Sequence, residues 1–231
     1  MKIATTVLAL FVSLPFTGPA AAQSRPFHLQ LEANPSAPFP WLGKFGSVDL
    51  HVYQGGVRAE ALWLNAFSAN RAKFVTVENP LGRAYVELPV VEIAPTLAKL
   101  AGKNAGVERA AVATLAKPLH GKVGGVDATR YRLMYGPQAW VDVWTTAAIP
   151  ENPQLRALVQ EFVRGVSPAS AELSKKIPGT PLYVELNFRR FKKVPVLTLK
   201  SLTFEAGDEA EALKLGALYF RAPILDALLK R

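Results

Sequence analysis

Short alternating segments are the feature of this sequence that most constrains its fold. The clearest pair alternates through Val48, Leu50 and Val52, turns at Gly55-Gly56 and resumes at Val57, which predicts a β-hairpin. About ten such segments follow one another at a spacing of roughly 8–12 residues, which is typical of an antiparallel sheet, a sandwich or an open barrel. The other predicted strands are Phe27–Leu31, Ala72–Val77, Arg83–Leu88, Ala110–Ala116, Asp127–Tyr135, Ala139–Thr146, Leu182–Phe188, Val194–Phe204 and Ala217–Arg221.

A few amphipathic helices are predicted between the strands. The clearest is Pro153–Arg164, where Asn152 is a good N-cap, proline takes the first helical position and Gly165 can end the helix. Its apolar residues form one stripe: Leu155, Leu158, Val159, Phe162 and Val163. Shorter helices are predicted at Glu92–Ala101, Ser167–Lys175 and Asp208–Leu215. Because each helix must bury its stripe, and a sheet face is the available partner, we expect a mainly β domain with a single curved sheet and helices on one face.

The N-terminus has the pattern of a cleavable signal peptide over residues 1–22. Lys2 gives the positive start, the apolar stretch runs from Ile3 to Phe16, and Ala20-Ala21-Ala22 provides the small residues that precede cleavage. A permanent membrane anchor is the competing interpretation, but the apolar span is shorter than the ~20 residues needed to cross a bilayer. We therefore expect an exported, periplasmic protein with a single β-rich domain over residues 23–231.

The charge and the absence of cysteine limit the possible partners. The chain carries a formal charge of +9 and no cysteine, so it has neither disulfides nor a lipoprotein anchor. Without Lys2 and the rest of the signal peptide, the charge falls from +9 to +8. Such an excess of positive charge favours anionic binding partners, which could be lipid head groups, membrane surfaces or nucleic acid. Export makes nucleic acid the least suitable of the three.

No residue pattern predicts catalysis. The three histidines, His28, His51 and His120, lie on separate segments without metal-ligand spacing. Phosphate-binding loops, nucleophile elbows and dinucleotide fingerprints are also missing from the sequence. We therefore expect no enzyme activity, no metal and no cofactor.

Two charged features each allow two interpretations. Asp142 stands between Trp140 and Trp144 on alternate strand positions, where it could be an acid of raised pKa or could face solvent or pair with Arg130 or Arg132. The basic turn of Arg189, Arg190, Lys192 and Lys193 around Phe191 could contact a membrane or an anionic head group. It could equally be a solvated turn whose charges discourage edge-to-edge aggregation.

Several short motifs resemble a known family in the same order along the chain. The strand-turn-strand from Phe74 to Tyr85 is followed by Gly124-Gly125 leading to Tyr131, by the tryptophan strand Trp140–Trp144, by the Pro-Gly-x-Pro-Leu segment Ile177–Leu182 and by the closing segment Ala217–Pro223. Together they cover roughly residues 45–223 and resemble a family of uncharacterised exported bacterial proteins related to the periplasmic lipoprotein carrier LolA. The resemblance implies a half-open antiparallel barrel whose concave face is apolar and covered by helices, and which carries acyl chains.

These observations lead to one hypothesis and one alternative. The strand aromatics either pack as a solid core or, together with the lid helices, line a cavity for a lipid, a lipoprotein acyl chain or another hydrophobic ligand. The predicted ligand-binding residues are Trp63, Phe74, Tyr85, Ile93, Leu97, Tyr131, Trp140, Trp144, Leu158, Phe162 and Phe188. The alternative is a sensory or scaffolding module similar to the periplasmic regulator RseB, which binds envelope proteins and has a well-packed interior with an exposed apolar patch.

Overall fold

The computed structural model describes residues 25–34, 46–62, 64–96, 113–135, 139–149, 152–166, 168–188, 193–204 and 207–222. The predicted signal peptide therefore lies outside the described residues. The strands are β1 (Phe27–Ala33), β2 (Ser47–Val52), β3 (Gly56–Ala61), β4 (Leu64–Ala69), β5 (Phe74–Asn79), β6 (Ala84–Pro89), β7 (Ala113–Leu115), β8 (Leu119–Val123), β9 (Val126–Tyr135), β10 (Ala139–Thr146), β11 (Thr180–Phe188), β12 (Val194–Thr203) and β13 (Phe220–Arg221). The helices are η2 (Val90–Glu92), α4 (Pro153–Val166), α5 (Pro168–Ser174) and α6 (Glu209–Ala212). Within those ranges, no helix combines the length and the apolar character needed to cross a membrane.

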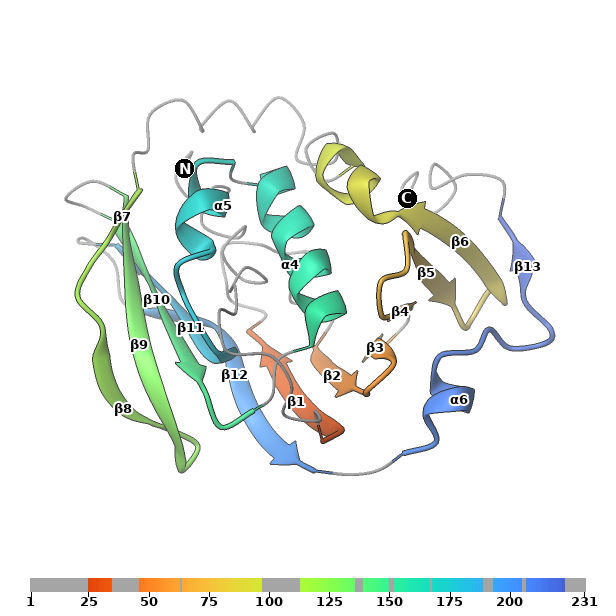
Figure 1. Cartoon of the computed structure of the whole chain (residues 1–231), viewed down its shortest axis with the longest axis horizontal. Coiled ribbons are helices and arrows are strands. Elements are labelled where there is room, and N and C mark those ends of the chain that lie inside the picture. Colours follow the sequence, from red (N-terminus) through yellow and green to blue (C-terminus); the bar gives the residue numbers. More distant parts are fainter. Residues whose placement is uncertain are drawn as a thin grey trace.

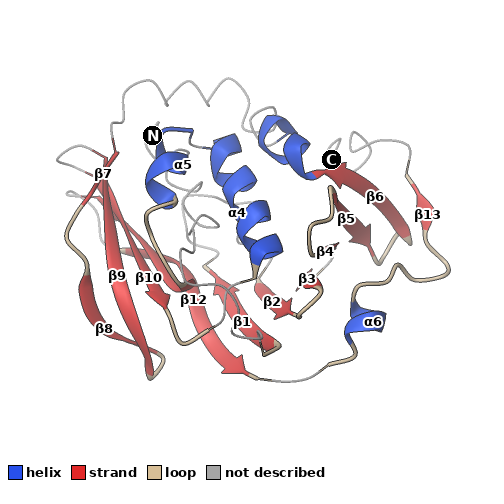
Figure 2. Ribbon diagram, viewed as in Figure 1, coloured by secondary structure: helices blue, strands red, loops and turns tan. Residues whose placement is uncertain are grey.

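The strands form one large sheet that curves around α4 and α5 (Figures 1 and 2). Its order is β13-β6-β5-β4-β3-β2-β1-β12-β11-β10-β9-β7, with β8 also paired to β9. Neighbouring strands are antiparallel except for β13, which pairs with β6 in parallel. This architecture confirms the prediction of a single curved, unclosed antiparallel sheet with a few helices on its concave side.

Side-chain alternation gives the sheet two distinct faces. Along β10, Val141 and Val143 are fully buried in the main core, against which leucines of α4 and α5 also pack. We call this helix-covered side the inner face. Since side chains alternate across a strand, Trp140, Asp142 and Trp144 point to the opposite side, the outer face. Residues that pair across neighbouring strands lie on the same face, so the pairing assigns the residues of the other strands to the inner or the outer face.

The sequence pattern missed two strands, β4 and β8, and misplaced the turn that follows β8. β4 was not predicted because each of its faces mixes polar and apolar residues, Asn65 with Phe67 on one and Ser68 with Leu64 on the other, so the segment shows no alternation. The β8–β9 turn was expected from Gly121 to Gly125 but occupies only Gly124 and Gly125, which have φ angles of 57° and 83°. Gly121 is a strand residue, and a Cβ there would lie 2.7 Å from the Trp144 ring. Glycine is therefore needed at position 121 for close packing rather than for a turn.

The predicted helices differ in how far they extend. Asp208 caps α6 as expected, since its carboxylate accepts hydrogen bonds from the backbone N–H groups of Ala210 and Glu211. The helix ends at Ala212 and not at Leu215. For the predicted helix Glu92–Ala101, residues 93–96 are helical after the η2 turn, and the remainder lies outside the described residues.

Candidate ligand-binding site

One half of the inner face is sealed. Val141, Val143, Leu182 and Val184 on β10 and β11 are each 0% exposed. Three leucines from the helices pack against this cluster: Leu155, Leu158 and Leu173. Full burial of each valine or leucine side chain contributes about 1.5–3 kcal/mol, so this half stabilises the fold and offers no room to a ligand.

The other half of the inner face is apolar and, beside buried residues such as Val52 (1% exposed) and Val57 (4% exposed), has a half-buried part. This part is formed by inward-facing residues of β2, β3, β4 and β5, which we call the open wing: Val48, Leu50, Ala59, Ala61, Leu64, Ala66 and Val77. Along the described parts of β2–β5, the inward positions carry no charged side chain. An uncharged, incompletely covered sheet face is a surface on which an apolar ligand can be buried.

Small side chains line much of the open wing. Ala59 lies directly opposite Leu50 on one side and Ala66 on the other. Alanine reaches less far above a sheet than the valines and leucines that fill the sealed half. Helix α4 contacts β3, the strand that carries Ala59 and Ala61, so the smallest side chains lie on the strand nearest this helix.

Buried hydrogen bonds pin α4 to the sheet at its N-terminal end. The Asn152 side chain accepts from the backbone N–H groups of Gln154 and Leu155 at 2.8 and 2.9 Å and donates to the Tyr53 carbonyl at 3.0 Å. The Gln154 amide donates to Ser68 Oγ at 2.7 Å, and these three polar side chains are at most 3% exposed. Because each group is satisfied, the contact holds this end of α4 firmly on the sheet.

Exposed leucines stand at the opposite end of the open wing. Leu62 in the β3–β4 turn and Leu81 in the β5–β6 turn are 83% and 82% exposed. The register of β4 against β5 places both turns at the same end of the sheet. The open wing therefore runs from the pinned end of α4 towards a turn-bearing edge with exposed apolar side chains.

The structure places the described members of the predicted ligand-binding set on two opposite faces of the sheet. Tyr131, Ile93 and Leu158 lie on the helix-covered side, where Tyr131 and Leu158 pack against the core and Ile93 is 9% exposed. Pairing of β4 with β5 and of β9 with β10 places the other described aromatics on the outer face: Phe74, Tyr85, Trp140 and Trp144. The rest of the predicted lining lies outside the described residues or side chains: Trp63, Leu97, Phe162 and Phe188. The same holds for Arg189, Arg190 and Lys192 of the basic turn, whereas Lys193 is described and exposed.

The two tryptophans of the outer face each lie beside an arginine of β9. Asp142 accepts two hydrogen bonds from Arg132, at 2.7 and 2.8 Å, and the same guanidinium lies 5.1 Å from the centre of the Trp140 ring. These bonds are the main cause of the raised Arg132 pKa. The pairing of Asp142 with Arg132 confirms the structural interpretation of this acid.

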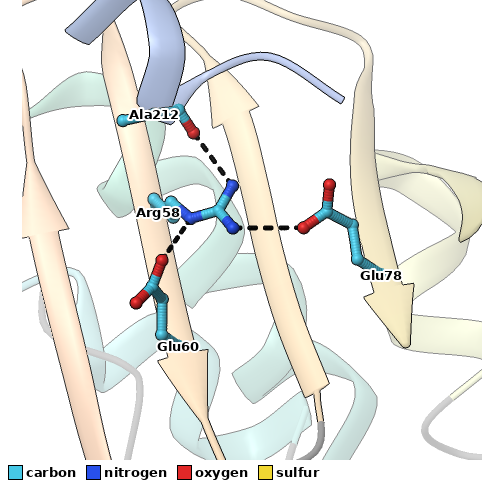
Figure 3. A network of polar contacts seen from close by, with 4 residues as sticks. All are labelled: Arg58, Glu60, Glu78 and Ala212. Carbon is cyan, nitrogen blue, oxygen red and sulfur yellow. Dashed lines mark hydrogen bonds and ion pairs between the residues drawn. The ribbon is translucent and has the colours of Figure 1, made fainter. Parts of the chain in front are cut away.

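A second polar cluster fixes the C-terminal segment to the outer face (Figure 3). Arg58 on β3 donates to Glu60 at 2.5 Å, to Glu78 at 3.1 Å and to the Ala212 carbonyl of α6 at 3.0 Å. Burial opposes the charge of Arg58, but its bonds to Glu60 and Glu78 outweigh that cost and raise its pKa. We call Arg58, Glu60, Glu78 and Ala212 the C-terminal latch.

A pocket of about 660 Å³ lies beside this latch, between β2–β5 and the C-terminal segment, with His51, Tyr53 and Tyr219 on its walls. Burial, and then the neighbouring His28, lower the pKa of His51, so its ring is neutral near pH 7. Burial, and then Glu60, raise the pKa of Tyr53. Among the described residues, no group of three histidines and acids is close enough to hold a metal ion, and the charged groups facing Arg58 are already paired with it.

Comparisons with known proteins give structural likenesses at low identity. No protein-family model matches the sequence, and no curated protein matches it either. An uncharacterized conserved protein from Thermus thermophilus is similar with a TM-score of 0.45 and 11% identity, over 86% of this chain and 91% of that one. LprF from Mycobacterium bovis has a TM-score of 0.31 and 12% identity, over 89% and 95% of the two chains. A domain described as a putative outer membrane lipoprotein-sorting protein domain from Vibrio parahaemolyticus has a TM-score of 0.24 and 10% identity, over 90% of both chains.

Proposed function

We propose that this protein is a periplasmic, non-catalytic carrier that holds a lipid, a lipoprotein acyl chain or a similar hydrophobic ligand on the open wing. The observation that supports it is the contrast within the inner face. Val141, Val143, Leu182 and Val184 are 0% exposed, whereas the residues of the open wing present an apolar surface that is only half-buried. Each methylene buried there contributes about 0.8 kcal/mol, so an acyl chain binds without any directional chemistry.

Helix α4 acts as the lid in this proposal. Its N-terminal end is pinned through Asn152 and Gln154, while Leu155 and Leu158 further along are half-buried. Because Leu155 and Leu158 pack against the core and Val159 is buried, α4 stays on the sheet in this proposal and acts as a fixed cover. The ligand then enters from the edge with Leu62 and Leu81.

Native mass spectrometry of the protein purified from a bacterial periplasm, followed by solvent extraction, tests the proposal. We expect an additional mass on the folded protein and an extracted lipid or fatty acid that accounts for it. Replacement of Ala59 by Phe fills the open wing and should abolish the additional mass. An empty wild-type protein that also fails to bind fluorescent fatty acids would refute the proposal.

A protein-binding module of the same fold is the second candidate. It is favoured by the sealed half of the sheet and by four exposed apolar residues near one end of β4–β6 and β13: Leu62, Leu81, Leu218 and Phe220. In-cell cross-linking with mass spectrometry distinguishes the candidates. Specific cross-links from this end to an envelope protein, without bound lipid, would favour the module over the carrier.

A further inference from the structure

A second pocket lies on the outer face, on the opposite side of the sheet from the open wing. It has a volume of about 340 Å³ and is lined by side chains of β8–β11 and by Lys193 before β12. The residues that matter for its chemistry are Lys122, Arg130, Trp144, Tyr183, Glu185 and Lys193. Trp144 stands directly opposite Arg130 on β9 and Tyr183 on β11, so an aromatic side chain lies between these two polar ones.

The acidic groups of this pocket are already engaged by neighbours. Asp142, whose side chain is 5% exposed, takes both of its bonds from Arg132. Glu185 accepts a hydrogen bond of 2.8 Å from the Tyr183 hydroxyl. Burial, and then this bond, raise the pKa of Tyr183, so the phenol keeps its proton. Arg132 therefore compensates Asp142, whereas Glu185 keeps its negative charge and is one anion beside the three cations of the pocket, Lys122, Arg130 and Lys193.

The cations, in contrast, are weakly compensated. The guanidinium of Arg130 lies 6.0 Å from the centre of the Trp144 ring, and neither Arg130 nor Lys193 forms an ion pair within the part of the chain that the structure describes. Lys122 has only Asp127, at 3.6 Å, in a pair whose side chains are 69% and 88% exposed. Such an exposed pair contributes little. The pocket therefore has an excess of positive charge beside one flat aromatic surface.

We infer that the outer pocket binds a phosphate ester, whose phosphate is held by Arg130 and Lys193 and whose organic part lies against Trp144. An arginine fork matches the oxygens of a phosphate, and Lys193 and Lys122 add point charges around it. A pocket of this size accommodates a small head group. The same chemistry is offered by a free phosphate ester and by the head group of an anionic phospholipid. The site is independent of the open wing, so it stands or fails separately from the proposed carrier function.

A titration monitored by NMR tests the site directly. The indole N–H signal of Trp144, assigned with Trp144→Phe, is followed as glycerol 3-phosphate is added to the full chain. We expect the signal to move, and Arg130→Gln to weaken binding by about tenfold or more, because hydrogen bonds to charged groups are among the strong ones. Lys193→Gln, at an exposed position, should also weaken it. The matched control is Lys73→Gln, an exposed lysine on the far half of the sheet, which should leave binding unchanged.

Vesicle binding then distinguishes the two sources of the phosphate. Sedimentation with phosphatidylglycerol-containing vesicles that depends on Arg130 identifies a lipid head group, whereas binding of glycerol 3-phosphate alone identifies a free ester; either outcome supports the site. The inference is overturned if neither ligand moves the Trp144 signal. It is also overturned if Lys73→Gln weakens binding as much as Arg130→Gln, because that result would reflect only the net charge of the protein.

Discussion

Replacement of Arg58 by Met should release the C-terminal segment and destabilise the fold. Arg58 is the shared partner of Glu60, Glu78 and the Ala212 carbonyl. The change keeps most of the side-chain volume above Phe67, to which the guanidinium lies 5.6 Å away. It removes the charge and the hydrogen bonds, so the result reports on the latch.

The three bonds contribute unequally. The side chain of Glu78 is 3% exposed and that of Glu60 is 43% exposed. An uncompensated buried carboxylate costs about 3–5 kcal/mol, whereas loss of an exposed pair costs at most about 1 kcal/mol. For a domain of this size, the larger cost lowers the melting temperature by roughly 6–20 °C. Most of the effect therefore comes from Glu78.

Urea denaturation of three variants measures these losses in the free energy of unfolding. Arg58→Met should lose about 3–5 kcal/mol, and Glu60→Gln at most about 1 kcal/mol. The double variant Arg58→Met with Glu78→Gln should recover much of the loss, since no buried charge remains. Trypsin should also cleave after Lys214 faster in Arg58→Met. An equal loss in Glu60→Gln and Arg58→Met, or no recovery in the double variant, would refute the reasoning.

Three further outcomes are expected. Gly121→Ala should destabilise the fold by about 1–3 kcal/mol through overpacking against Trp144, and the loss should shrink in a Trp144→Leu background when a double-mutant cycle is measured by thermal unfolding. Asn152→Ala should cost about 1–3 kcal/mol, because it removes an N-cap and leaves buried groups unpaired; urea titration measures it, and an unchanged midpoint would contradict the pinned helix. The pKa of His51 is lowered by burial and by His28, so the unfolded chain binds its proton at higher pH than the folded one. Stability should therefore fall as the pH drops from about 7 to 5, and His51→Gln should flatten that fall in melting curves; an unaltered slope would exclude this residue as the cause.

The sequence predicted where the strands and helices occur better than which face of the sheet is covered by helices. Period-two alternation located most strands, and the Asn152-Pro153 start of α4 is realised by the cap that the structure shows. Alternation also places Trp140 and Trp144 on one face, but it cannot say which face the helices cover. The acid between them was an available signal, because a charged residue is rarely buried under a helix unless it is paired.

The open wing was not predicted because its lining is inconspicuous. Ala59, Ala61 and Ala66 are small residues in segments that read only as strands or, for β4, as no element at all. Their significance depends on the coverage left by α4, which is a tertiary property. The C-terminal latch was missed for a similar reason, since it joins residues from β3, β5 and α6.

Binding of a fluorescent fatty acid to two matched variants tests the carrier function most directly. Ala59→Phe fills the inner face, whereas Thr76→Phe adds the same ring to the outer face of a strand in the same half of the sheet. If the inserted ring displaces about three methylenes of the acyl chain, affinity falls by roughly 60-fold. The account predicts this loss for Ala59→Phe with wild-type affinity for Thr76→Phe, both proteins being folded by circular dichroism. Equal affinities of the two variants, or no binding by the wild type, would contradict it.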